Sequence, residues 1–136
     1  DNAYLPHNYT PHCVCYTGTH DNDTAAGWYA SASKQERAFA EKYLGISGAE
    51  AVRLALLRAG QGSVAELFIA QMQDYLGLGS ESRINVPGVG QGNWRWRLLP
   101  GQTAAELAEE IRSLTALYGR CPWRPEIERN KSTKND

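Results

Sequence analysis

The sequence lacks several features that would assign it to a class at once. Its 136 residues contain no run of 18 consecutive apolar residues, so we expect no membrane-spanning helix. Its first residues form neither a basic nor an apolar segment, so we expect no signal peptide and a cytoplasmic location. The first residue is Asp1 rather than methionine, and we expect the chain to be a piece of a longer one.

The sequence also has no surplus of basic residues. Fourteen lysines and arginines stand against 15 aspartates and glutamates, which gives a net charge of −1. Because proteins that bind nucleic acid through its phosphates usually carry a basic surplus, we expect no nucleic-acid partner. The shares of hydrophobic residues, 42%, and of charged residues, 21%, are typical of a folded soluble domain and argue against a disordered chain.

Cysteines are few. Cys13, Cys15 and Cys121 are an odd number, which argues against a disulfide framework, and Cys13 and Cys15 are expected to be small buried apolar residues. With the three histidines they show no C-x-x-C or H-x-x-x-H spacing, so we expect no metal site. The glycine-rich segment 88–92 has no Walker lysine and does not fit G-x-G-x-x-G, so we expect no cofactor.

The first half of the chain alternates between extended and helical patterns. Residues 1–12 are rich in Pro, His, Asn and Tyr and predict a loop. The β-favouring run 13–17 predicts a strand, which a polar segment at 19–24 follows. A helix is then expected over about 25–44, ended by Gly45.

Three Ser/Thr-x-x-Glu patterns predict further helix starts. They are Ser47 with Glu50, Ser63 with Glu66, and Thr103 with Glu106. The last helix should end near Gly119, before Pro122. The second pattern is ambiguous, because the apolar run 67–72 fits either a continued helix over 64–78 or a buried strand.

The order of these elements favours an α/β fold with a parallel sheet. Two strands cannot bury a parallel sheet on both faces, so the architecture is expected to be incomplete alone. Residues 79–102 form a long loop, and loops of that length are usually functional. We expect residues 1–125 to belong to one domain and residues 126–136 to form a charged, disordered tail.

The polar segment is the first candidate for a functional site, because functional residues gather at the carboxyl ends of parallel strands. His20 and Asp21 fit either a functional pair or a turn in which their polar groups are hydrogen-bonded. The spacing of the residues alone does not decide between these two interpretations. For Asp23 the role of helix N-cap is favoured, with Thr24 as the other candidate for that cap.

The second candidate is the stretch over residues 83–97. Trp94 and Trp96 alternate with Arg95 and Arg97, which favours a half-exposed strand with packed indoles. Aromatic faces also bind sugar rings, and Trp with Arg can stack on bases. The net charge of −1 counts against a single-stranded nucleic acid.

These stretches also carry a resemblance to a known family. The sequence resembles the 4-α-glucanotransferases, also called amylomaltases or disproportionating enzymes. The matching motifs are Leu5-Pro6-His7-Asn8-Tyr9, the block from Tyr16 to Thr24 followed by Gly27-Trp28, the segment from Gln73 to Gly79, Asn85-Val86-Pro87-Gly88, and the segment from Gly92 to Leu98. Several motifs in the same order cover most of the chain, from about residue 4 to 117.

The resemblance implies the C-terminal portion of a (β/α)8 TIM barrel, about its last two βα units. The strand at 13–16 would then be the seventh of the barrel. The run before Gln73 would be the eighth, which favours strand over helix for that segment. The helix from Thr103 would close the barrel.

The family is similar to the α-amylases in mechanism, which is retaining and passes through a covalent intermediate. By resemblance, Asp21 is the carboxylate that stabilises the transition state, and His20 is the histidine that bonds the same sugar. Asn85 is expected to line the substrate cleft, and His7 is a further candidate for substrate binding. The expected partners are maltooligosaccharides, with neither nucleic acid nor membrane.

The nucleophile aspartate and the acid/base glutamate of the family lie on earlier strands than any found here. We therefore expect a fragment that lacks both, is inactive alone and needs the missing N-terminal part of the barrel. The alternative is a non-catalytic α-glucan-binding module that kept Trp94, Trp96 and the polar segment.

Overall fold

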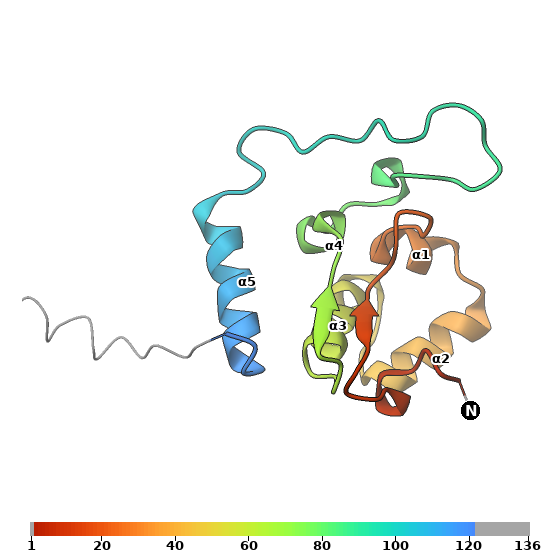
Figure 1. Cartoon of the computed structure of the whole chain (residues 1–136). Helices are drawn as coiled ribbons and strands as arrows, with labels where there is room; N and C mark the ends of the chain where they lie inside the picture. The colour runs from red at the N-terminus through yellow and green to blue at the C-terminus, as the bar shows by residue number, and fades with distance from the viewer. Residues whose placement is uncertain (1, 122–136) are drawn as a thin grey trace, which may run out of the picture.

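A computed structural model describes residues 2–121. The elements in chain order are the short 3-10 helix η1 (Pro6–Asn8), strand β1 (Val14–Tyr16), helices α1 (Ala25–Ser31), α2 (Lys34–Leu44) and α3 (Ala49–Gln61), strand β2 (Leu67–Ile69), helix α4 (Met72–Leu76), the 3-10 helix η2 (Ser80–Ser82) and helix α5 (Ala105–Leu117). The strands pair in parallel, and their arrows point to the edge where α1 and α4 lie (Figure 1). The expected α/β class with a parallel sheet is confirmed.

The two faces of the small sheet differ. Cys15 and Phe68 are partners on one face, where Cys15 is buried and Phe68 packs against α3. A Cβ added to Gly60 in α3 would lie only 2.1 Å from the Phe68 ring, so glycine is what allows helix and strand to pack this closely. The opposite face carries apolar side chains that are 41–51% exposed, namely Val14, Tyr16, Leu67 and Ile69.

Helix α3 forms the centre of the core. It contacts α1, α2, α4 and α5 and buries Val52 and Leu57 completely. The expected burial of the cysteines holds for Cys15, whereas Cys13 is partly exposed. The core therefore lies on one side of the sheet, which agrees with the expectation that two strands alone bury only one face.

The single helix expected over 25–44 is wrong. The chain breaks at Ala32 and starts again at Ser33, whose Oγ accepts a hydrogen bond from the Glu36 backbone N–H at 3.2 Å. The Glu36 carboxylate in turn accepts from the Ser33 N–H at 2.8 Å. This reciprocal capping box fixes the start of α2, and its Ser-x-x-Glu pattern was present in the sequence.

The predicted capping boxes are also corrected. Gly48 and Ala104, rather than Ser47 and Thr103, occupy the N-cap positions of α3 and α5. Ser63 starts no helix, because its hydroxyl donates back to the Gly60 carbonyl at the end of α3. The strand alternative for the segment after it, which the family resemblance favoured, is confirmed as β2.

The long loop expected over 79–102 contains only η2 as a regular element, and it crosses from η2 to α5 as an open arc (Figure 1). The alternating Trp–Arg stretch forms no strand. Helix α5 ends at Leu117, two residues before Gly119, whose φ of +69° fits the expected left-handed stop. Pro122 and the tail over 126–136 lie outside the described residues. No helix within residues 2–121 has the length and apolar character to cross a membrane.

Asp74 ties the carboxyl ends of both strands together. It lies in α4 just after β2 and is only 2% exposed. One carboxylate oxygen accepts from the Thr17 hydroxyl at 2.6 Å, directly after β1, and the other accepts from the Ala25 N–H at 2.7 Å, at the start of α1. One side chain thus joins three elements. It also accepts from the Ala25 N–H, which has no partner within α1 because it lies in the first turn of the helix.

We predict that Asp74→Ala lowers the free energy of unfolding by about 2–4 kcal/mol, because it removes two hydrogen bonds to a charged acceptor and leaves buried donors unpaired. Urea unfolding followed by tryptophan fluorescence measures the loss. Glu66→Gln changes an exposed carboxylate at the other end of β2 and serves as the control. Equal midpoints for the two variants would show that Asp74 does not stabilise the fold.

A second polar contact joins α1 to α2 and α3. The Tyr29 hydroxyl donates to the Glu41 carboxylate, which also accepts from the Gly48 N–H at 3.1 Å. These hydrogen bonds, the one from Tyr29 first, hold the pKa of Glu41 below its ordinary value of 4.5. The same contact raises the pKa of Tyr29.

The lowered pKa of Glu41 predicts a pH dependence of stability. A group with a lower pKa in the folded state contributes its full stabilisation above the unfolded value of 4.5, and loses it as the pH falls through the folded value. Glu41→Gln should therefore reduce the acid dependence of the urea midpoint below pH 4.5. Glu50→Gln, on the neighbouring helix, should keep the wild-type dependence. An unchanged dependence in Glu41→Gln would contradict this linkage.

Candidate functional site

The polar segment after β1 is held at both ends. Asp74 binds Thr17 before the segment and Ala25 after it. Thr24 is the N-cap of α1, since its Oγ1 accepts from the Gly27 N–H at 3.0 Å. The N-cap role favoured for Asp23 therefore belongs to Thr24. Asp23 instead accepts from the Thr24 N–H at 2.8 Å and from the Ser80 hydroxyl at 2.7 Å, which links the segment to η2.

Asn22 shapes the middle of the segment. Its side-chain oxygen accepts from both the backbone N–H and the hydroxyl of Thr19, at 2.8 and 2.9 Å. The turn that results leaves the side chains of His20 and Asp21 about half exposed, at 53% and 48%. They stand at the carboxyl ends of the parallel strands, where the sequence predicted a site.

Three of the predicted site residues meet there. The Asn85 side-chain amide donates to Asp21 Oδ1 at 2.5 Å, and His20 Nε2 lies 3.3 Å from the same oxygen. The Asn85 backbone N–H also donates to the His20 carbonyl at 3.1 Å. A carboxylate, an imidazole and an amide from segments 64 residues apart therefore form one cluster.

Arg83 supports this cluster through hydrogen bonds to its backbone. Its Nη2 donates to the Asp21 carbonyl at 2.6 Å, and its Nε donates to the Asn85 carbonyl at 2.9 Å. A planar guanidinium presents such donors in a fixed fork, so it sets the spacing of the two segments. Arg83 begins the candidate stretch over residues 83–97, but the sequence pattern assigned it no role of its own.

The loop after Asn85 closes on itself. The Asn93 side chain accepts from the Val86 N–H at 2.9 Å and donates to the Val89 carbonyl at 2.8 Å. Gly88 and Gly92 adopt φ values of +80° and +85°, which the two turns of the loop require. The loop surrounds an open cavity of about 460 Å³ that Asn85 also lines.

Trp94 ends this loop in a strained conformation. Its φ of +63° is the one positive value of a non-glycine residue within residues 2–121, and its backbone N–H donates to the Ile84 carbonyl at 2.7 Å. Such strain costs on the order of 1–3 kcal/mol. The indole lies against His20, with ring centroids 5.0 Å apart and an interplanar angle of 38°. From the sequence, Trp94 was expected to pack or to bind a sugar, and its contact with His20 was not predicted.

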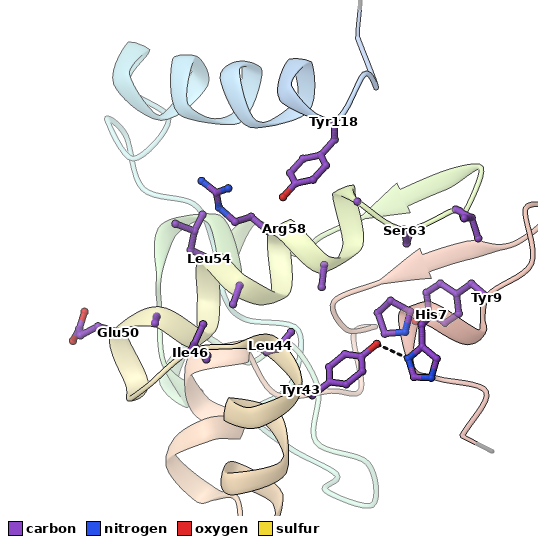
Figure 2. Close-up of a pocket in the computed structure, with 16 residues that line it drawn as sticks. His7, Tyr9, Tyr43, Leu44, Ile46, Glu50, Leu54, Arg58, Ser63 and Tyr118 are labelled. Carbon is purple, nitrogen blue, oxygen red and sulfur yellow. Dashed lines mark hydrogen bonds between the residues drawn. The ribbon is translucent and has the colours of Figure 1, made fainter.

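His7 is not part of the cluster, and its role in substrate binding stays a prediction. It belongs to η1, which precedes β1 and lies at the opposite, amino-terminal end of the strands (Figure 1). Its Nδ1 lies 2.8 Å from the Tyr43 hydroxyl at the edge of a cavity of about 950 Å³ (Figure 2). His7 therefore helps to anchor η1 on α2.

The cluster has the chemistry of a polar binding site. Within the described chain, no hydrogen bond to Asp21 Oδ2 is found, so this oxygen of a half-exposed side chain can accept one from a ligand. The nearby carboxylates of Asp23 and Asp74 are engaged in the hydrogen bonds given above. Residues 2–121 hold no group of three or more His, Cys, Asp or Glu side chains that would bind a metal ion.

Comparisons with known proteins agree with these features. A family model described as 4-alpha-glucanotransferase matches residues 1–103. The 4-alpha-glucanotransferase of Thermus thermophilus is 48% identical over 121 residues, which cover 84% of this chain and 24% of that protein. The enzyme of the same name from Clostridium butyricum is 46% identical over 121 residues, which cover 88% of this chain and 25% of that protein.

A solved structure is similar over most of the described fold. It is the amylomaltase from Streptococcus agalactiae in complex with acarbose, with a TM-score of 0.83 and 31% identity. The match covers 90% of this chain and 25% of the amylomaltase chain. The chain thus spans about a quarter of the length of these relatives, and it belongs to the 4-alpha-glucanotransferase family.

Proposed function

We propose that this chain supplies two neighbouring strand–loop units to the catalytic barrel of a 4-alpha-glucanotransferase, which transfers α-1,4-glucan segments between maltooligosaccharides. The observation that carries the proposal is the meeting of Asp21, His20 and Asn85 at the carboxyl ends of two parallel strands. In TIM-barrel enzymes this edge holds the active site. The acarbose bound to the related amylomaltase supports a carbohydrate ligand.

We place the chain in the last two βα units of the barrel, with β1 and β2 as adjacent strands and residues 1–125 as part of the catalytic domain. The half-exposed apolar face of the sheet supports this placement. In a closed barrel such side chains fill the interior, packed against those of the other strands. The four side chains are 41–51% exposed in this chain, as expected if the strands that would cover them belong to the rest of the barrel.

Asp21 is the residue to which we assign transition-state stabilisation. In a retaining transfer, the donor sugar develops positive charge as its glycosidic bond breaks. A carboxylate held in a fixed place stabilises that charge and accepts strengthened hydrogen bonds from the sugar hydroxyls. Asn85 fixes one oxygen of Asp21, and the other is exposed to a ligand. Arg83 fixes the backbone, so the carboxylate needs little reorganisation.

His20 and Asn85 complete the proposed sugar-binding group. The His20 ring can hydrogen-bond the hydroxyl groups of the sugar that Asp21 contacts, and Asn85 lies on the wall of the adjacent cavity. The nucleophile and the acid/base carboxylates would come from other strands of the barrel. Retention requires these two groups about 5–5.5 Å apart, whereas Asp74 is buried and Asp23 is committed to Ser80 and Thr24.

A non-catalytic glucan-binding module is the less favoured alternative. The relatives that match are named as transferases, and the matched region includes the whole polar cluster. A binding module would need a sugar platform, but Trp94 turns its indole toward His20.

We predict that Asp21→Asn lowers the rate of maltotriose disproportionation by about 10²–10³-fold, because an amide keeps the shape but removes the charge that stabilises the transition state. The protein encoded by the complete native reading frame is incubated with maltotriose, and glucose and longer maltooligosaccharides are measured by chromatography.

Glu66→Gln serves as the control, since it removes one carboxylate at the opposite end of β2. It should retain wild-type rates. A wild-type protein that folds but releases neither product would contradict the transferase function. An active wild type with an equally active Asp21→Asn would contradict the role of Asp21 alone.

A further inference from the structure

We propose that Trp94 is a positioning residue that holds the His20 imidazole in the orientation needed for glucan transfer. This inference rests on the proposed function and deepens it, since it names a second residue that controls the same site. It concerns the contact of two rings that lie 74 positions apart in the sequence, on the two loops that form the cluster.

The backbone of Trp94 supports a specific role. Large side chains rarely adopt a positive φ, and a residue strained in this way persists only where its surroundings impose the conformation. Here the hydrogen bond to the Ile84 carbonyl and the side chain of Asn93 close the loop around it. A glycine would adopt the same φ of +63° without strain, so the conformation alone does not explain a tryptophan.

Packing within the described residues does not explain the tryptophan either. Trp94 is 56% exposed there, so residues 2–121 provide it with little core contact. The ring contact that it does make is to His20, at a centroid distance of 5.0 Å, within the range of favourable aromatic pairs. Within residues 2–121, the contact with His20 is therefore the specific interaction that places the indole.

His20 needs such support because it is itself about half exposed. A free histidine on a loop would exchange between rotamers, and only a fraction would face a bound sugar. Two contacts restrict it here, the Asp21 carboxylate at Nε2 and the Trp94 indole at the ring. With Nε2 directed to Asp21, the Nδ1 edge of the ring is the one offered to a ligand.

A double-mutant cycle in the complete protein tests the inference, with initial rates measured over a range of maltotriose concentrations. Trp94→Gly removes the ring and suits the loop conformation, while Trp94→Phe keeps an aromatic ring. We expect Trp94→Gly to lower kcat about tenfold, because misplacing a group that orients the sugar slows the chemical step. Trp94→Phe should retain most activity.

In a His20→Ala background, Trp94→Gly should cause less than about a twofold further loss, because residues that act as a unit are not additive. Leu99→Ala removes another exposed apolar side chain of the same loop region and should behave as wild type. If Trp94→Gly does not fold, Trp94→Leu, which keeps apolar bulk without a ring, takes its place in the cycle.

Additive losses in the cycle, or a rise in KM with unchanged kcat, would overturn the inference, because the indole would then act on the fold or directly on the sugar. So would full activity of Trp94→Gly alongside a strong loss in His20→Ala. That last result leaves the proposed function intact, whereas a folded but inactive wild type would overturn the proposed function itself.

Discussion

The carboxylate of Asp74 is the constraint on which the site depends. It binds Thr17 and Ala25, the residues on either side of the polar segment that follows β1. The segment is therefore fixed at both ends by a buried carboxylate. A charge buried in this way is tolerated because strong donors satisfy it, and it makes the geometry of an exposed loop depend on the core.

The second loop completes the arrangement from the other side. Arg83 joins the backbones of Asp21 and Asn85, and Trp94 restricts His20. The groups offered to a ligand are exposed, whereas several of the bonds that place them run through backbone carbonyls. Exposed side chains on a fixed backbone suit the glucan transfer that we propose. Such a site accepts sugars from solvent and stabilises developing charge without moving its own groups.

Sequence patterns predicted the parallel α/β class, the strand at 13–17 and the long loop, and they named Asp21, His20 and Asn85, which the structure brings together. They failed where the same short sequence pattern is compatible with more than one local structure. One Ser-x-x-Glu pattern, at Ser33, forms a capping box, while the one at Ser63 precedes a strand, because packing of Phe68 on α3 decides between helix and strand there. His7 also matched a family motif, but η1 precedes β1 and so lies at the opposite end of the strands from Asp21; its role in substrate binding stays a prediction.

The central claim is that this chain provides one functional part of a glucanotransferase barrel. The most direct measurement is to replace the matching segment of the Thermus thermophilus enzyme with this chain and to assay maltotriose disproportionation by the chimaera. The account predicts a folded protein with activity within about tenfold of the parent, because core and interface substitutions of similar size are usually tolerated. A chimaera that folds but transfers no glucan would contradict it.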